Sequence, residues 1–182
     1  MVIVPYDEKW SKDFCNIKSV LLKYLSIPVI IEHVGSTSIV GMYAKPIIDL
    51  VIAIDKSEFQ IIKNDLFKIG YTHEGDLGII GREAFKRENI IKYQYLDKII
   101  HHLYVCSLDN TEYKRFILFR NYLRNHSDKR DEYKKIKMEI IDKYGQDNRE
   151  KYVSIKENEY KWFFENIIEK AKHEVNTWEF NI

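Results

Sequence analysis

A glycine-serine turn, a lysine and an aspartate fall within one short segment and could together act on a phosphate. Residues 35–38 read Gly-Ser-Thr-Ser, and Lys45 and Asp49 follow. Backbone N–H groups and small hydroxyls at such a turn can hold phosphate oxygens. A lysine adds positive charge, and a carboxylate can bind a metal ion or an acceptor hydroxyl. The segment predicts phosphate binding, with these candidate residues: Gly35, Ser36, Thr37, Lys45 and Asp49.

Asp49 is the residue of this segment that most needs an explanation. It interrupts the run 46–54, which is otherwise apolar and predicts a strand covered on both faces. Burying an unpaired carboxylate costs several kcal/mol. Two interpretations stay open: a functional carboxylate at the mouth of the strand, or a structural one satisfied by backbone donors or by Lys45.

Composition limits the class of protein. The chain has 182 residues, of which 45% are hydrophobic and 31% charged, and its net charge is +1. These values fit one globular domain and give no reason to expect a nucleic-acid partner. No apolar run approaches the roughly 20 residues that span a membrane, and the first residues do not resemble a secretion signal. We therefore expect a cytoplasmic protein with no membrane partner, whose Cys15 and Cys106 are buried thiols.

Hydrophobic periodicity predicts an α/β (α+β) fold: a mixed β-sheet packed by helices, followed by a helical C-terminal part. We expect one domain over residues 1–182, with the sheet in about 1–108 and helices in about 109–182. Asp97 and Lys98 are predicted to form the turn of a hairpin. The expected helices are 7–25, 57–69, 110–126, 128–145 and 153–175, and the expected strands are 29–31, 46–54, 92–96 and 99–106.

A cluster of lysines falls in the predicted helix 128–145. Lys134, Lys135 and Lys137 are interpreted as its charged, solvated face, because most lysine side chains lie at the surface. The inward face is expected to carry the apolar and aromatic positions of the same helix.

The phosphate-binding segment also resembles a known family. Residues 32–49 read EHVGSTSIVGMYAKPIID. The signature of the GrpB-like family typically reads His-Val-Gly-Ser-Thr-small-Val-Pro-Gly-x-x-x-Lys-Pro-Ile-Ile-Asp. Further similar blocks occur at 4–10, 81–85, 102–103, 119–124 and 152–156. That family is similar to the nucleotidyltransferase fold, so the resemblance implies a nucleotidyltransferase-like sheet and transfer of a nucleotidyl or phosphoryl group.

The resemblance implies further site residues. His102 is expected beside Asp49 as a catalytic residue, whereas His101 should point to the opposite sheet face, since strand neighbours alternate. Basic residues in the matching blocks are interpreted as binding an anion at the turn, although a solvated face would explain them too. With the histidine of the signature, these candidate substrate-binding residues are His33, Arg82, Arg120 and Lys156.

The sequence departs from the nucleotidyltransferase pattern at the metal site. That pattern has two acids separated by one residue and a third on a later strand, but Val51 follows Asp49 and the later strand carries His101 and His102. Two metal ions held by three carboxylates are therefore not expected. Asp49 stays the candidate ligand for Mg²⁺ or Mn²⁺, whereas Asp49 with His33 and His102 would suit Zn²⁺.

The leading hypothesis is a nucleotidyltransferase-like protein that binds a nucleotide or a phosphorylated small molecule at the glycine-serine turn and the strand aspartate. The alternative is a non-catalytic module that binds an anion or a nucleotide and has a degenerate metal site. Replacement of Asp49 by asparagine separates the two, because only an enzyme should lose turnover.

Overall fold

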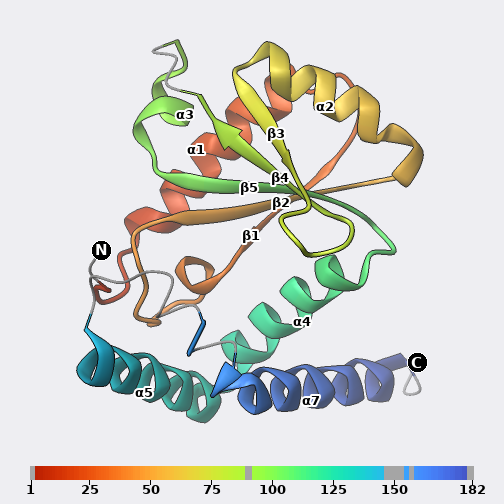
Figure 1. Ribbon diagram of the computed structural model, residues 1–182. Helices are drawn as coiled ribbons and strands as arrows, with labels where there is room; N and C mark the ends of the chain where they lie inside the picture. Colours follow the sequence, from red (N-terminus) through yellow and green to blue (C-terminus); the bar gives the residue numbers. More distant parts are fainter. Residues whose placement is uncertain (1–2, 89–91, 146–153, 156–157, 180–182) are drawn as a thin grey trace.

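A five-stranded mixed sheet forms the centre of the chain in the computed structural model, which describes residues 3–88, 92–145, 154–155 and 158–179 (Figure 1). The strand order is β1-β2-β5-β4-β3, with β2 and β5 parallel and the other neighbours antiparallel. The mixed sheet packed by helices confirms the predicted fold class. The strands are β1 (Ile30–Val34), β2 (Ile48–Ile54), β3 (Tyr71–Gly75), β4 (Arg82–Arg87) and β5 (His101–Ser107).

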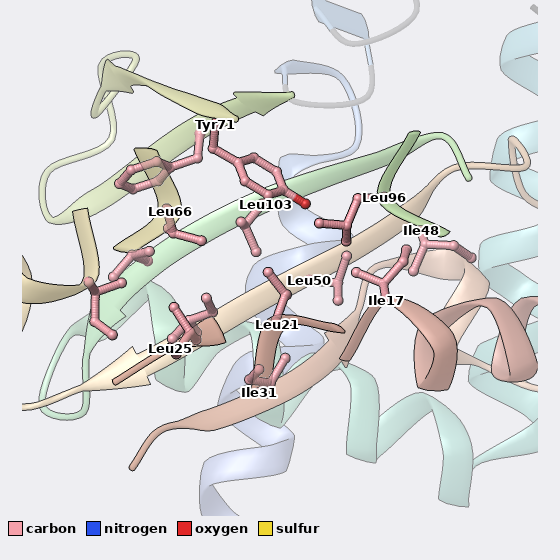
Figure 2. Packing of buried hydrophobic residues seen from close by; sticks show 14 of the residues in the cluster. Ile17, Leu21, Leu25, Ile31, Ile48, Leu50, Leu66, Tyr71, Leu96 and Leu103 are labelled. Atoms are coloured by element: carbon pink, nitrogen blue, oxygen red, sulfur yellow. The ribbon is translucent and has the colours of Figure 1, made fainter. Parts of the chain in front are cut away.

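Helices cover both faces of this sheet. One face packs on α1, α2 and α3 through a large apolar core, where Figure 2 shows Ile17 and Leu21 of α1 next to Leu50 of the sheet. The other face packs on α4 through a smaller cluster. The helices are α1 (Lys9–Tyr24), α2 (Phe59–Lys68), α3 (Gln94–Lys98), α4 (Thr111–Asn125), α5 (Ser127–Tyr144) and α7 (Lys161–Glu179), with the 3₁₀ turns η1 (Ser36–Ser38) and η2 (Lys56–Glu58).

The strand register decides which polar side chains share a face. Asp49 is paired with Val34 on one side and with His102 on the other. Directly paired residues point to the same face and their chain neighbours to the opposite one. Asp49 and His102 therefore lie on the α4 face, whereas His33 and His101 point to the face that α1 covers.

A second apolar core ties the C-terminal helices to the segment after the glycine-serine turn. Ile39 and Met42 from that segment are fully buried against Leu123 of α4, Tyr133 of α5 and Phe163 of α7. Figure 1 shows α5 and α7 on the side of the sheet where α4 lies. This core holds η1 between the sheet and the C-terminal helices.

The predicted hairpin at 92–106 is wrong. Its second strand exists as β5, but the first half folds into the short helix α3. Asp97, the expected turn residue, instead accepts hydrogen bonds from the backbone N–H groups of Lys92 (2.8 Å) and Tyr93 (2.5 Å), and from Arg87 Nε at 2.9 Å. With a fourth hydrogen bond from Arg87 Nη2 at 2.6 Å, this carboxylate closes the chain into a helical turn, so no two-residue hairpin forms.

Two further expectations need correction. The last long helix begins at Lys161 and not near residue 153. Residues 153, 156 and 157 of the expected helix lie outside the described residues. Both cysteines are free, and Cys106 is buried as expected, but Cys15 is exposed. Within the described ranges, no helix combines the length and apolar character that a membrane crossing requires.

Candidate functional site

The glycine-serine turn is built directly against Asp49. Gly35 has φ 68°, in the region that favours glycine, and a Cβ added there would lie 2.2 Å from Asp49 Oδ2. Any side chain at residue 35 would therefore collide with the carboxylate. The sequence places a glycine here because the turn and the strand aspartate must approach this closely.

Asp49 forms a pair with His102 from the neighbouring strand. His102 Nδ1 lies 2.8 Å from Asp49 Oδ1, and both side chains keep about a third of their surface exposed, at 33% and 29%. A carboxylate can only accept, so Nδ1 carries the proton and donates it to this bond. The carboxylate thus holds the imidazole in place through Nδ1. The second ring nitrogen, Nε2, can then accept a proton from a reacting group.

Lys137 of α5 is the site residue that the sequence analysis missed. Its Nζ donates to Ser36 Oγ at 2.5 Å and to the backbone oxygen of Tyr43 at 2.7 Å, and the residue is only 4% exposed. The prediction of a solvated lysine is wrong. The signal was present, since Lys137 lies four residues after Tyr133 and four before Ile141, on the apolar stripe of the helix.

Tyr133 completes the buried end of this cluster. The ammonium of Lys137 lies 4.6 Å from the centre of its ring. Burial raises the pKa of Tyr133 to about 12, a hydrogen bond with Ser36 acts in the opposite direction, and the negative charge of Asp49 raises it further. The phenol is therefore protonated at neutral pH and lies close enough to Asp49 to sense its charge.

Arg82 of β4 lies on the same sheet face as Asp49 and His102. It is paired with Cys106, and its guanidinium stacks over the ring of Tyr104 at 4.7 Å. Its Nε is buried, and among the described residues no hydrogen-bond partner reaches it. Tyr104 is in turn 6.4 Å from His102, ring centre to ring centre. Arg82, Tyr104 and His102 therefore form one row of side chains on this sheet face, and Arg82 does not reach the glycine-serine turn.

His33 supports the turn from the opposite sheet face. It is 6% exposed, stacks on Phe14 at 4.8 Å, and its Nε2 lies 3.0 Å from Thr37 Oγ1. Thr37 donates its own hydroxyl proton to the backbone oxygen of Ile47, so Nε2 is the donor to Thr37. Burial lowers the pKa of His33 to about 4, and the ring is neutral. His33 therefore does not join Asp49 and His102 in the Zn²⁺ set considered from the sequence.

Two arginines of α4 hold the backbone around the turn. Arg120 is 7% exposed and its Nη1 donates to Glu32 Oε2 at 2.5 Å and to His33 O at 2.9 Å. Arg124 donates through Nε and Nη2 to the backbone oxygen of Ser38, at 3.0 and 2.7 Å. The Arg120 guanidinium, which was expected to bind substrate, thus donates hydrogen bonds to Glu32 and to the His33 backbone of the protein itself.

The two remaining candidates are lysines. Lys45 is half-buried in the segment that leads into β2, where its backbone oxygen accepts from Ile47 N at 2.7 Å. Lys156 lies outside the described residues.

The donor set does not fit a two-metal centre. In the described part of the chain, no three His, Cys, Asp or Glu side chains come together in a way that could hold a metal ion. Val51, where the nucleotidyltransferase pattern has its second acid, is fully buried, and His102 faces Asp49 from the next strand. Mg²⁺ and Mn²⁺ prefer oxygen ligands, of which this pair supplies only the Asp49 carboxylate.

Two solved structures with a similar fold are a GrpB protein and a poly(U) polymerase. A conserved protein GrpB from Enterococcus faecalis has a TM-score of 0.75 at 27% identity, covering 93% of this chain and 98% of that one. The Cid1 poly(U) polymerase, solved with MgGTP bound, has a TM-score of 0.50 at 14% identity, covering 70% of this chain and 41% of that one. The second likeness shows a nucleotidyltransferase-like fold and concerns the fold alone.

Sequence comparison places the chain in a family. It is 34% identical over 169 residues to the UPF0157 protein YqkA of Bacillus subtilis, covering 88% of this chain but only 47% of that protein. The chain thus spans about half the length of this relative. The model of the GrpB protein family matches residues 1–170. The chain therefore belongs to the GrpB protein family.

Proposed function

We propose that this protein binds the phosphate groups of a nucleotide, or of another phosphorylated small molecule, at the Gly35–Thr37 turn. The observation that carries the proposal is the contact of Lys137 Nζ with Ser36 Oγ at 2.5 Å. It places a positive charge next to the hydroxyl of a turn whose backbone lies against Asp49. Oriented donors with a fixed cation are how proteins stabilise phosphoryl oxygens.

The pair of Asp49 and His102 supplies the groups for a transfer reaction. An acceptor hydroxyl attacks phosphorus, the new O–P bond forms, and the bond to the leaving phosphate or pyrophosphate breaks in line. His102 Nε2 takes the proton of the acceptor, and Asp49 stabilises the imidazolium that results. Lys137 offsets the negative charge that develops on the phosphoryl oxygens. This sequence of steps uses only side chains of the chain itself.

Nucleotides are the first ligand class to test. The solved structure of Cid1 holds MgGTP, and Cid1 shares the fold of this chain. Arg82 stacked over Tyr104 offers a flat surface in the same row as His102, and stacked aromatic and guanidinium groups are common supports for a base. Both points support a nucleotide over a smaller phosphorylated molecule.

A non-catalytic binding module is the second candidate. Val51 is fully buried at the position of the second acid, and the one remaining carboxylate is already hydrogen-bonded to His102. A protein of this kind would keep the phosphate-binding turn and carry out no transfer.

The test is thermal unfolding of the full chain against nucleoside triphosphates, diphosphates and phosphorylated metabolites, with and without Mg²⁺, Mn²⁺ and Zn²⁺. A ligand that binds the native state raises the free energy of unfolding by about 2.7 kcal/mol at a hundredfold excess over Kd. We expect a rise in Tm with at least one nucleotide. No rise with any nucleotide, on a well-folded sample, contradicts the proposal.

The Asp49→Asn variant then separates the two candidates. An enzyme is expected to lose turnover by about 10²–10⁴-fold while still binding the nucleotide, because His102 loses the carboxylate that orients it. A binding module is expected to show no turnover in the natural protein and to bind as well or better in the variant. Release of pyrophosphate or inorganic phosphate is the readout.

A further inference from the structure

A cavity of about 320 Å³ lies behind the glycine-serine turn, away from the Asp49 site. It is formed by the start of the chain and of α1, the turn itself, and the junction of α4 with α5. Its lining includes His33, which points to the sheet face opposite Asp49 and His102. The lining residues are Tyr6, Ser11, His33, Thr37, Ser38, Val40, Arg124 and Arg130.

The polar lining of this cavity is cationic. Among the residues that the structure describes, its lining contains two guanidinium groups, four hydroxyls and no carboxylate. Arg124 uses Nε and Nη2 on the Ser38 backbone oxygen, which fixes its guanidinium in place. Arg130 makes two long contacts of 3.4 Å from Nη1, to the backbone oxygens of Leu123 and Arg124. A guanidinium has five N–H donors, so both groups keep donors for a ligand.

The hydroxyls differ in what they can offer. Ser38 donates to the backbone oxygen of Gly35 at 2.6 Å, and Thr37 donates to Ile47 O, so both can only accept from a ligand. Ser11, in the first turns of α1, and Tyr6 supply the hydroxyls whose protons can turn towards the cavity. Two guanidinium groups, of which that of Arg124 is fixed in place, match the oxygens of a phosphoryl group together with these two hydroxyls.

We propose that this cavity is a second ligand site, which binds a small molecule through a phosphoryl group held by Arg124 and Arg130. Its volume is at the lower end of small-molecule pockets, about 300–1,000 Å³, and so favours a ligand not much larger than the phosphoryl group and a few carbons. Thr37 and Ser38 line it from the same turn whose Ser36 contacts Lys137. The proposal does not depend on the function proposed for the Asp49 face.

The test is a residue-resolved NMR titration of the ¹⁵N-labelled full chain with inorganic phosphate and, separately, glycerol 3-phosphate. Backbone amides of Ser11, Val40 and Arg130 report on the cavity, whereas those of Leu50 and His102 report on the Asp49 face. We expect saturable shifts of the cavity amides with one shared Kd. Tighter binding of glycerol 3-phosphate than of phosphate would identify an organic phosphate as the ligand class, and the reverse order would identify the free anion.

Two matched pairs of variants place the ligand. Val40 is 66% exposed at the rim, so neither Val40→Glu nor Val40→Gln should disturb folding. The added carboxylate is expected to weaken binding about tenfold through repulsion, and the neutral glutamine should change Kd within about twofold. Arg130→Gln should weaken ligand binding about tenfold to hundredfold. Lys135→Gln changes an exposed lysine of the same helix and should leave binding unchanged.

Three outcomes would overturn the second site. They are no saturable shift of the cavity amides, shifts confined to Leu50 and His102, and a Kd that neither Val40→Glu nor Arg130→Gln changes. Shifts of Leu50 and His102 alone would leave the function proposed for the Asp49 face standing. Shifts at the cavity alone would support the second site, and thermal unfolding against nucleotides would still test the function proposed for the Asp49 face.

Discussion

Lys137 Nζ lies 2.5 Å from Ser36 Oγ, although the two residues are 101 positions apart in the chain. One belongs to a turn that follows the first strand of the sheet, and the other to a helix of the C-terminal part. The contact means that the glycine-serine turn is completed by α5. The same helix also contributes Tyr133, which packs beneath that turn.

The close approach of Gly35 to Asp49 predicts a clash on substitution. Gly35→Ala would place a Cβ 2.2 Å from Asp49 Oδ2 and force a non-glycine residue to φ 68°. We expect a loss of about 2–4 kcal/mol in the free energy of unfolding, measured in urea. Gly75→Ala is the control, since residue 75 has φ 78° and no atom of the described residues lies within 4 Å of an added Cβ, so the change should cost only about 1 kcal/mol. Equal losses for both variants would contradict the close approach.

Buried His33 predicts a pH dependence of stability. Its pKa is about 4 in the folded protein, against 6.5 for a histidine side chain exposed to water. Between these values the unfolded chain binds more protons, so stability falls as the pH falls from about 6.5 towards 4, by up to about 3 kcal/mol from this residue. His33→Gln, which can still donate to Thr37, should flatten this part of the profile. Identical urea-unfolding profiles for the two proteins would contradict the prediction.

Arg120 is predicted to act on stability and not on ligand binding. Arg120→Met leaves Glu32 and the His33 carbonyl without their donor, at a cost of about 2–4 kcal/mol. Arg115→Met on the same helix removes an exposed ion pair at 3.3 Å and should cost less than about 1 kcal/mol. Urea unfolding measures both, and the folded Arg120→Met variant should keep the nucleotide affinity of the natural protein. A large loss of affinity with unchanged stability would return Arg120 to the binding site.

The two thiols are predicted to react at very different rates. Burial raises the pKa of Cys106 to about 12, whereas Cys15 is exposed. Because the thiolate is the reactive form, a thiol reagent at neutral pH should modify Cys15 of the native protein quickly and Cys106 only after unfolding. Cys15→Ser should abolish the fast reaction. Fast modification that persists in Cys15→Ser would show that Cys106 is accessible.

The sequence predicted those parts of the site that depend on a single segment. The turn at 35–38 and the strand carrying Asp49 follow from glycine and small residues next to an apolar run, and both are where the sequence put them. The pairing of Asp49 with His102 needed the strand order as well, which the resemblance supplied. Alternation along β5 correctly separated His102 from His101.

The remaining errors concern residues whose role depends on tertiary contacts. Lys137 was placed at the surface because lysines usually are, although it lies on the apolar stripe of α5. The anion-binding role expected for Arg120 stays a prediction, whereas its contact with Glu32 was missed because the two residues are 88 positions apart in the chain. A strand was expected where α3 forms, because the hydrogen bonds that Asp97 accepts from Arg87, Lys92 and Tyr93 can be seen only in the folded structure.

Calorimetric binding of ATP, GTP, CTP and UTP to the natural chain and to Lys137→Met tests whether the turn and Lys137 bind a nucleotide. Methionine can fill the space of the buried lysine stem, and an unchanged fold is checked by thermal unfolding. Lys135→Met, at an exposed position of the same helix, is the control. We predict that at least one nucleotide binds, that Lys137→Met weakens it about tenfold to hundredfold, and that the control does not. Equal affinity in the folded Lys137→Met variant, or no binding to the natural chain, would contradict the account.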